Sequence, residues 1–176
     1  MNAVRNILNK VLNLLAGLSL TVMVVLTTYQ VVTRYVFNNP STWSEELVGY
    51  LFAWATMFGA TIVSGERGHM NIPLLVDSSK PAIKKLLLIF SEIIAFLFSA
   101  AILVFGGLQV SSLAMGQQTS SLGVAVGVFY WVMPICGIVM ALYAVLNIID
   151  IAKGNTEAVL DEAAAAIAKA EAEKEA

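Results

Sequence analysis

Hydrophobic side chains are gathered into four long runs, and short polar stretches separate these runs from one another. Each run is long enough to cross a hydrocarbon core of about 30 Å as a helix that rises about 1.5 Å per residue. Membrane-spanning strands have about 10 residues with strict alternation, and none of the runs alternates in this way. The pattern therefore predicts an all-α integral membrane protein with four transmembrane helices. They are expected over about residues 11–33, 44–64, 81–115 and 122–149.

Turn-forming residues separate the first span from the second. Asn38 and Asn39 precede Pro40, which forces the residue before it out of the α region, while asparagine tolerates turns. Thr42 and Glu45 then have the spacing of a capping box, in which both side chains bond free amides of the first helical turn. The second helix is therefore predicted to start at this capping box, with its acidic residues at the membrane surface.

Irregularities are predicted in the two later spans. A helix over residues 81–115 would be about 52 Å long at 1.5 Å per residue, which exceeds the thickness of a bilayer core. It must tilt, protrude, or bend near Gly106 and Gly107. Pro134 removes a backbone hydrogen bond within the fourth span and is expected to kink that helix.

Composition supports the membrane assignment, and the charge distribution orients the chain. Of the 176 residues, 59% are hydrophobic and 12% are charged, far outside the balance of soluble proteins. Nine of the ten lysines and arginines lie in the N-terminal segment, the second connection and the C-terminal tail; only Arg34 lies in the first connection. Because positive residues favour the cytoplasmic side, both termini are predicted to be cytoplasmic.

Two regions are expected along the chain. Residues 1–150 form the transmembrane domain, and the first span is interpreted as a retained helix because it is too long for a secretory signal. Residues 151–176 are rich in Ala, Glu and Lys, which favours a cytoplasmic helical tail with little apolar surface to bury.

A stripe of small residues marks one face of the second predicted helix. Its members recur at steps of three and four positions, so they lie on one side of a helix, where a second helix can approach closely in lipid. They are Gly49, Ala53, Thr56 and Ala60, continued by Ser64. This face is predicted to contact another helix, either within the chain or in a partner.

The third span contains the only acidic residue well inside an apolar run, Glu92. An ionisable group within a span is costly and marks either a pathway or a buried pairing. Polar and small residues follow it at helical spacing and should share a face shielded from lipid: Ala95, Ser99, Ile102, Gly106 and Gln109. A packing or ion-pair role, with Lys85 on the same face, is favoured over coupling to protons or ions.

The sequence gives little support to enzymatic chemistry. One histidine, His69, cannot supply both axial ligands of a transmembrane b-type haem, and one cysteine, Cys136, cannot form a disulfide within the chain. The glycines of the turn after the second span do not form a phosphate-binding loop. The basic residues are scattered, which argues against nucleic acid as a partner. No catalytic residue, metal site or cofactor is expected.

Four short motifs occur in a fixed order along the chain. They are Arg34-Tyr-Val-Phe37, Trp43-Ser-Glu-Glu-Leu47, Phe58-Gly-Ala60 and the turn from Gly65 to His69. In this order and at these separations they resemble the DctQ-type small membrane subunit of TRAP transporters, the tripartite ATP-independent periplasmic family. The resemblance covers about residues 10–150.

This resemblance implies a non-catalytic subunit of a sodium-driven inner-membrane transporter for organic acid anions, either sialic acid, which general resemblance weakly favours, or C4-dicarboxylates. A secreted periplasmic protein delivers the substrate, the large membrane subunit carries it, and the small subunit packs beside the scaffold of the large one within the lipid. Positions typical of the family are Arg34, Trp43, Glu45, Glu46, Arg67 and His69.

Two further hypotheses concern charged residues. Arg34 is predicted to pair with Glu45 or Glu46 at the outer surface, where an exposed pair contributes about 0 to 1 kcal/mol. The alternative to a subunit is an autonomous small transporter that uses Glu92 as its coupling carboxylate.

Overall fold

The computed structural model describes residues 2–66 and 81–153, with side chains from Val4 and from Lys85 onwards in these two stretches. Arg67 and His69 lie outside the described residues, and so does nearly all of the predicted tail. The helices are α1 (Asn2–Tyr35), α2 (Thr42–Gly65), α4 (Pro81–Phe98), the π-helix η1 (Ser99–Gly106), α5 (Gly107–Ala114), α6 (Val126–Tyr130) and α7 (Val132–Ala152).

Long apolar helices account for nearly all of the described chain. Four of its stretches are long and apolar enough to cross a membrane, namely Val4–Tyr35, Thr42–Gly65, Lys85–Ala114 and Val126–Ala152. Among the described residues no strand occurs, and the only strand-like pairing is an isolated bridge between Gln118 and Ala125. The prediction of an all-α protein with four candidate spans is confirmed.

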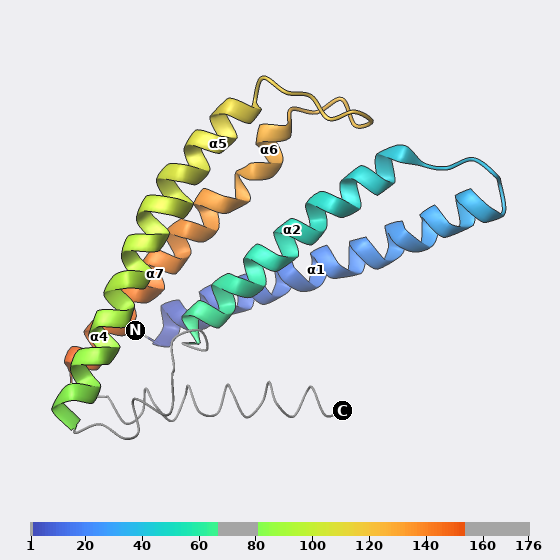
Figure 1. Cartoon of the computed structure of the whole chain (residues 1–176). Helices are drawn as coiled ribbons and strands as arrows, with labels where there is room; N and C mark the ends of the chain where they lie inside the picture. Colours follow the sequence, from blue (N-terminus) through green and yellow to red (C-terminus); the bar gives the residue numbers. More distant parts are fainter. Residues whose placement is uncertain (1, 67–80, 154–176) are drawn as a thin grey trace.

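The described helices form two antiparallel hairpins (Figure 1). One consists of α1 and α2; in the other, α4, η1 and α5 run beside α6 and α7. The end at which Asn2 and Lys153 lie is called the terminal end, and the opposite end, with residues 36–41 and 115–125, is called the loop end. The hairpins converge at the terminal end and diverge toward the loop end (Figure 1).

The start of α2 differs from the predicted capping box. Thr42 is already helical, and Ser41 occupies the N-cap position with extended backbone angles and no side-chain cap bond. Instead, the Ser44 hydroxyl donates to the Ser41 hydroxyl oxygen at 2.8 Å and to its carbonyl at 3.0 Å. The capping box was wrong because the helix begins one residue earlier than it requires. The turn before it agrees with the sequence, since Asn38 has a positive φ of 48°.

The third span changes its helical geometry twice, first at Ser99 and again at Gly106 and Gly107. After α4 the chain forms η1, whose turns are wider than those of an α-helix, and α5 then resumes at Gly107. The buried positions accordingly move to Leu103, Gly107, Ser111 and Ala114. This is one residue out of step with the α-helical periodicity expected after Ser99.

The fourth span starts later than predicted and is interrupted. Residues 117–125 form a tight turn in which the Thr119 amide donates to the Val124 carbonyl at 2.9 Å. Gly123 has a φ of +66°, a conformation that favours glycine. The helix then breaks at Trp131, between α6 and α7, one turn before Pro134. Proline cannot donate the bond that would continue the helix across this point, so the predicted irregularity lies on its N-terminal side.

Candidate functional site

The first three positions of the small-residue stripe on α2 are not covered by another helix of the described chain. Gly49, Ala53 and Thr56 are exposed, and a Cβ added to Gly49 would meet nothing within 4 Å. Thr56 bonds within its own helix, with its hydroxyl donating to the Phe52 carbonyl at 2.8 Å. Ala60 is half-buried. The sequence left open whether this face contacts a helix of the same chain or of a partner. The described part of the chain supplies no such contact at Gly49, Ala53 and Thr56.

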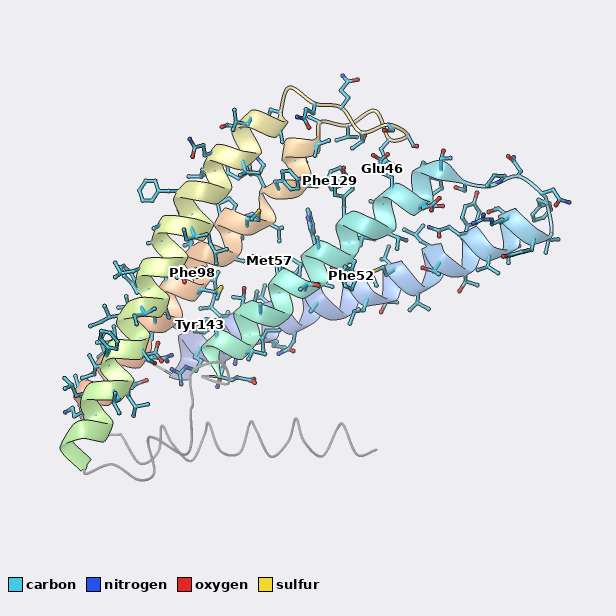
Figure 2. All side chains as sticks on the ribbon, viewed as in Figure 1. Glu46, Phe52, Met57, Phe98, Phe129 and Tyr143 are labelled. Carbon is cyan, nitrogen blue, oxygen red and sulfur yellow. The ribbon has the colours of Figure 1, made fainter. Side chains whose placement is uncertain are left out.

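An apolar groove of about 460 Å³ lies beside this stripe. Ala60 belongs to both features. The groove lies between the hairpins: α2 contributes Met57, Ala60 and Ser64, α7 contributes Met140, and the third span contributes Ile94, Ala95, Phe98, Ser99 and Leu103. Figure 2 labels Met57 and Phe98 on the two hairpins. The Ser99 hydroxyl donates to the Ala95 carbonyl at 2.7 Å, so this polar lining atom is satisfied within its own helix.

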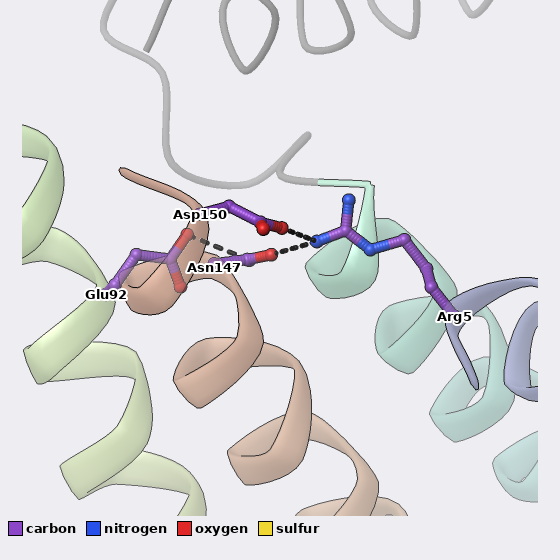
Figure 3. Close-up of polar contacts among 4 residues, drawn as sticks. All are labelled: Arg5, Glu92, Asn147 and Asp150. Atoms are coloured by element: carbon purple, nitrogen blue, oxygen red, sulfur yellow. Dashed lines mark hydrogen bonds and ion pairs between the residues drawn. The ribbon is translucent and has the colours of Figure 1, made fainter. Parts of the chain in front are cut away.

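Glu92 belongs to a polar cluster at the terminal end, named here the terminal junction: Arg5, Glu92, Asn147 and Asp150 (Figure 3). Glu92 and Asn147 are buried, whereas Arg5 and Asp150 are half-buried. Glu92 is 5% exposed and accepts a hydrogen bond of 3.0 Å from the Asn147 amide, which is fully buried. The Asn147 carbonyl oxygen accepts from Arg5 at 2.5 Å, and Arg5 also lies 3.6 Å from the Asp150 carboxylate. Helices α1, α4 and α7 therefore meet through side chains that hold charge away from lipid.

The predicted Glu92 face is correct in its first half and wrong in its second. Ala95 and Ser99 are buried with Glu92, but Ile102 and Gln109 are exposed. The π-helical segment causes the change, because it shifts the register after Ser99. The expected partner of Glu92 is also corrected, since Lys85 instead donates to the Ala152 carbonyl at 3.4 Å. The geometry of Glu92 is that of a packed, hydrogen-bonded group.

The predicted pairing of Arg34 is wrong. Arg34 is exposed and, among the described residues, forms no ion pair with Glu45 or Glu46. Both oxygens of Glu46 accept hydrogen bonds, from the backbone amides of Ser120 at 3.1 Å and Ser121 at 2.9 Å. The Glu46 carboxylate is thus occupied by two turn amides, and an exposed ion pair with Arg34 would contribute only about 0 to 1 kcal/mol.

Glu46 is part of a second attachment between the hairpins, named here the loop junction: Glu46, Tyr50 and Trp54 of α2 with Ser120, Ser121 and Phe129. The rings of Tyr50 and Phe129 stack with centroids 4.0 Å apart and planes inclined by 7°. The Trp54 indole N–H donates to the Phe129 carbonyl at 2.8 Å, next to the break in the fourth span. Figure 2 shows Glu46 and Phe129 where α2 approaches α6.

The remaining predicted positions lie at the loop end or outside the described residues. Trp43 is 40% exposed and contacts the Tyr29 ring, with centroids 5.9 Å apart, and Glu45 is exposed. Among the described residues, no group of three or more His, Cys, Asp and Glu side chains is arranged to hold a metal ion.

Sequence reasoning missed most residues that join the hairpins. Arg5 was counted only as a topological charge, although it contacts the fourth span. Asn147 carried a usable signal, because an amide near the end of an apolar span must find a partner. Tyr143 is fully buried, and its hydroxyl donates to the Asn9 side chain. Nothing in the sequence identified that pairing.

Residues 23–154 match the family described as tripartite ATP-independent periplasmic transporters, DctQ component. This match covers most of the chain and parts of all four spans. The chain belongs to the DctQ family. Glu92, Asn147 and Asp150 lie within the matched DctQ region, whereas Arg5 precedes it.

Named relatives agree with membership of the DctQ family. The sialic acid TRAP transporter small permease protein SiaQ of Vibrio cholerae is 27% identical over 149 residues, which are 85% of this chain and 86% of that protein. The C4-dicarboxylate TRAP transporter small permease protein DctQ of the same organism is 27% identical over 82 residues, 47% of this chain and 35% of the relative. The sialic acid TRAP transporter permease protein SiaT of Haemophilus influenzae is 30% identical over 77 residues, 44% of this chain but 12% of SiaT.

Proposed function

We propose that this DctQ-family chain is the non-catalytic small membrane subunit of a TRAP transporter, and that it binds the large permease subunit directly and stabilises its scaffold. The observation that carries the proposal is the family match over residues 23–154. The similarity to SiaT supports direct contact, because there a segment like this chain is a small part of a much longer permease.

The transported substrate is proposed to be an organic acid anion, either sialic acid or a C4-dicarboxylate. The names of the relatives support both classes. Driving by a sodium gradient, and delivery of substrate by a periplasmic binding protein that docks on the complex, follow from the family resemblance. The small subunit contributes no catalytic group to this scheme.

The chain is proposed to lie in the bacterial inner membrane with both termini in the cytoplasm. Asn2 and Lys153 lie at the same end of the described helices, as two antiparallel hairpins require. The excess of Lys and Arg in the termini and in the connection from 67 to 80 supports a cytoplasmic location for this end. The loop end would then face the periplasm. Residues 1–150 are proposed as the membrane domain and 151–176 as a cytoplasmic tail.

The stripe on α2 and the neighbouring groove are proposed to bind a helix of the large subunit. Helix association in lipid depends on close packing, and exposed small side chains at Gly49, Ala53 and Thr56 permit a close backbone approach. The groove next to Ala60 offers space for larger side chains of the partner. Arg34, Trp43, Glu45 and Gln109 are exposed and are proposed as contacts around this face; Arg67 and His69 are proposed from the resemblance alone.

The deciding experiment is reconstitution of uptake. A large TRAP permease subunit, a periplasmic binding protein and radiolabelled sialic acid or a C4-dicarboxylate are combined in liposomes, with and without this chain. We expect uptake that requires the full set and an inward sodium gradient. Uptake by this chain alone would instead support the autonomous transporter, and full uptake by a stable large subunit without this chain would contradict the proposed role.

A further inference from the structure

The two hairpins contact each other near both ends and also through a buried apolar cluster of α1, α2 and α7 between these ends: Leu12, Phe58, Val132, Cys136 and Tyr143. At the terminal end the attachments are the polar side chains of the terminal junction, together with the hydrogen bond from Tyr143 to Asn9. At the loop end they are the aromatic and backbone contacts of the loop junction. Between these ends lies the apolar groove, with α2 on one side and the third span on the other.

Long side chains form the attachment of α1 to α7. Helix α1 packs along α2, whereas α7 packs against α2, α4 and η1. Arg5 reaches Asn147 and Asp150, and one helical turn further along, Asn9 accepts from Tyr143. These polar links lie beside an apolar cluster in which Leu12 of α1 and Phe58 of α2 pack with Tyr143 of α7, so their loss opens the terminal end while the cluster still holds the hairpins together.

The side-chain amide of Asn147 fits this attachment in only one of its two orientations. Its carbonyl oxygen accepts from the Arg5 guanidinium, and its amide nitrogen donates to the Glu92 carboxylate. The reversed amide would place N–H groups against N–H donors of arginine, and an oxygen against an acidic oxygen, so both contacts would be repulsive. Arg5 and Glu92 are therefore coupled through a buried amide that lies between them.

We infer that Asn147 is a positioning residue that sets the angle between the two hairpins and thereby the width of the groove. The apolar cluster and the loop junction together act as the pivot, since they hold α2 to the fourth span independently of the polar cluster. Ala95, on the groove wall, lies one helical turn from Glu92. Movement of the third span away from α1 at Glu92 consequently moves the groove wall away from α2.

The inference concerns the full chain on its own and is tested in lipid nanodiscs without any partner, so its failure is distinguishable from failure of the proposed function. Spin labels are attached in a Cys136→Ala background at exposed positions. One pair, Ile7 and Leu86, reports the terminal end; the other, Phe52 and Leu113, reports the loop end. Pulsed electron paramagnetic resonance measures the distance distribution within each pair.

The variant Asn147→Leu removes both hydrogen bonds at similar side-chain size. We expect the equilibrium at the terminal end to shift about tenfold or more toward separated hairpins, because a hydrogen bond to a charged group is worth at least that factor. The distribution at the loop end should stay unchanged. The matched control is Asn13→Leu, since Asn13 is exposed and donates only to the carbonyl of Asn9, within its own helix.

Two further measurements keep the inference open to refutation. If Asn147→Leu is not monodisperse, Arg5→Met tests the same link near the start of α1, where a local change is better tolerated. In a folded Asn147→Leu background, Arg5→Met should widen the distribution much less than it does in the parent chain. An unchanged terminal distance in a folded variant, or equal effects of Arg5→Met in both backgrounds, would overturn the inference.

Discussion

Asn147 of α7 donates a hydrogen bond of 3.0 Å to Glu92 of α4, and both side chains are almost fully buried. The acidic residue of the third span is thus held by a neutral amide. On the other side of this amide lies Arg5. The sequence favoured a packing or ion-pair role for Glu92, but its position in the chain did not identify these partners.

Replacement of Glu92 by Gln should leave transport intact. Glutamine retains a side-chain oxygen that accepts from Asn147, so this bond loses its charge-assisted part, and stability should fall by about 1 kcal/mol. The measurement is uptake by the reconstituted complex together with thermal unfolding in detergent. Glu66→Gln, at an exposed acid of the same protein, is the control. Loss of uptake in an intact complex would assign a coupling role to Glu92.

Replacement of Gly49 by Leu should reduce recovery of the large subunit. Leucine fits the free chain, because nothing lies within 4 Å of the position of an added Cβ, but it prevents close approach of a partner helix. The measurement is the ratio of the two subunits after affinity purification, with an expected loss of about tenfold if 1.4 kcal/mol of packing is removed. Gly17→Leu is the matched control, since Gly17 of α1 is equally open. Equal recovery of the two variants would count against the α2 face.

Replacement of Glu46 by Ala should release the connection from 117 to 125. The change removes the acceptor for the amides of Ser120 and Ser121, at a cost of about 1 to 3 kcal/mol. Hydrogen exchange at these two amides should accelerate, as measured by mass spectrometry of the purified chain. The adjacent Glu45→Ala should have no such effect, because Glu45 is exposed and forms no ion pair among the described residues. Identical exchange in both variants would contradict the role assigned to Glu46.

Replacement of Gly137 by Ala should destabilise the packing of the third and fourth spans. An added Cβ would lie 2.7 Å from the Leu103 Cβ, so a helix must shift, and such overpacking costs about 1 to 3 kcal/mol. Thermal unfolding followed by tryptophan fluorescence measures the effect. Gly59→Ala is the control: no atom lies within 4 Å of its added Cβ, and alanine favours the helix by about 0.5 to 1 kcal/mol. A Gly137 variant as stable as the Gly59 variant would refute this contact.

The π-helical register predicts which neighbouring residue of the third span faces lipid. Val110 is 43% exposed and Ser111 is 1% exposed. A spin label at Val110 should therefore collide readily with dissolved oxygen in the bilayer, whereas a label at Ser111 should be shielded. A regular α-helix with about 3.6 residues per turn would place Val110, five full turns after Glu92, on the face of Glu92 and would give the opposite order, so these two accessibilities distinguish the registers.

Several features of the fold follow from local sequence. The length of the apolar runs predicts four spans because a bilayer of fixed thickness demands a helix of fixed minimum length. The break after Tyr35 follows from the preferences of Asn38 and Pro40, and the irregular fourth span follows from the missing amide of Pro134. These properties depend on residues close together in the chain, and they were readable before the helices were packed.

The candidate site was predictable only where it continued such local patterns. The small-residue stripe on α2 and the buried positions from Glu92 to Ser99 obey helical spacing and were identified. The position of Gln109 was not, because η1 changes the number of residues per turn, and its close packing at Leu103 against Gly137 is a contact between spans. Periodicity assumes one helix type throughout.

The sequence by itself determined that the chain crosses a membrane with four helices, and its ordered motifs pointed to the DctQ family. Only the tertiary structure decided that Arg5 and Glu92 meet through Asn147, and that Glu46 binds the Ser120 and Ser121 amides rather than Arg34. The physical reason is that hydropathy and turn preferences act within one segment, whereas a buried polar side chain selects a partner according to which segments packing brings within about 3 Å.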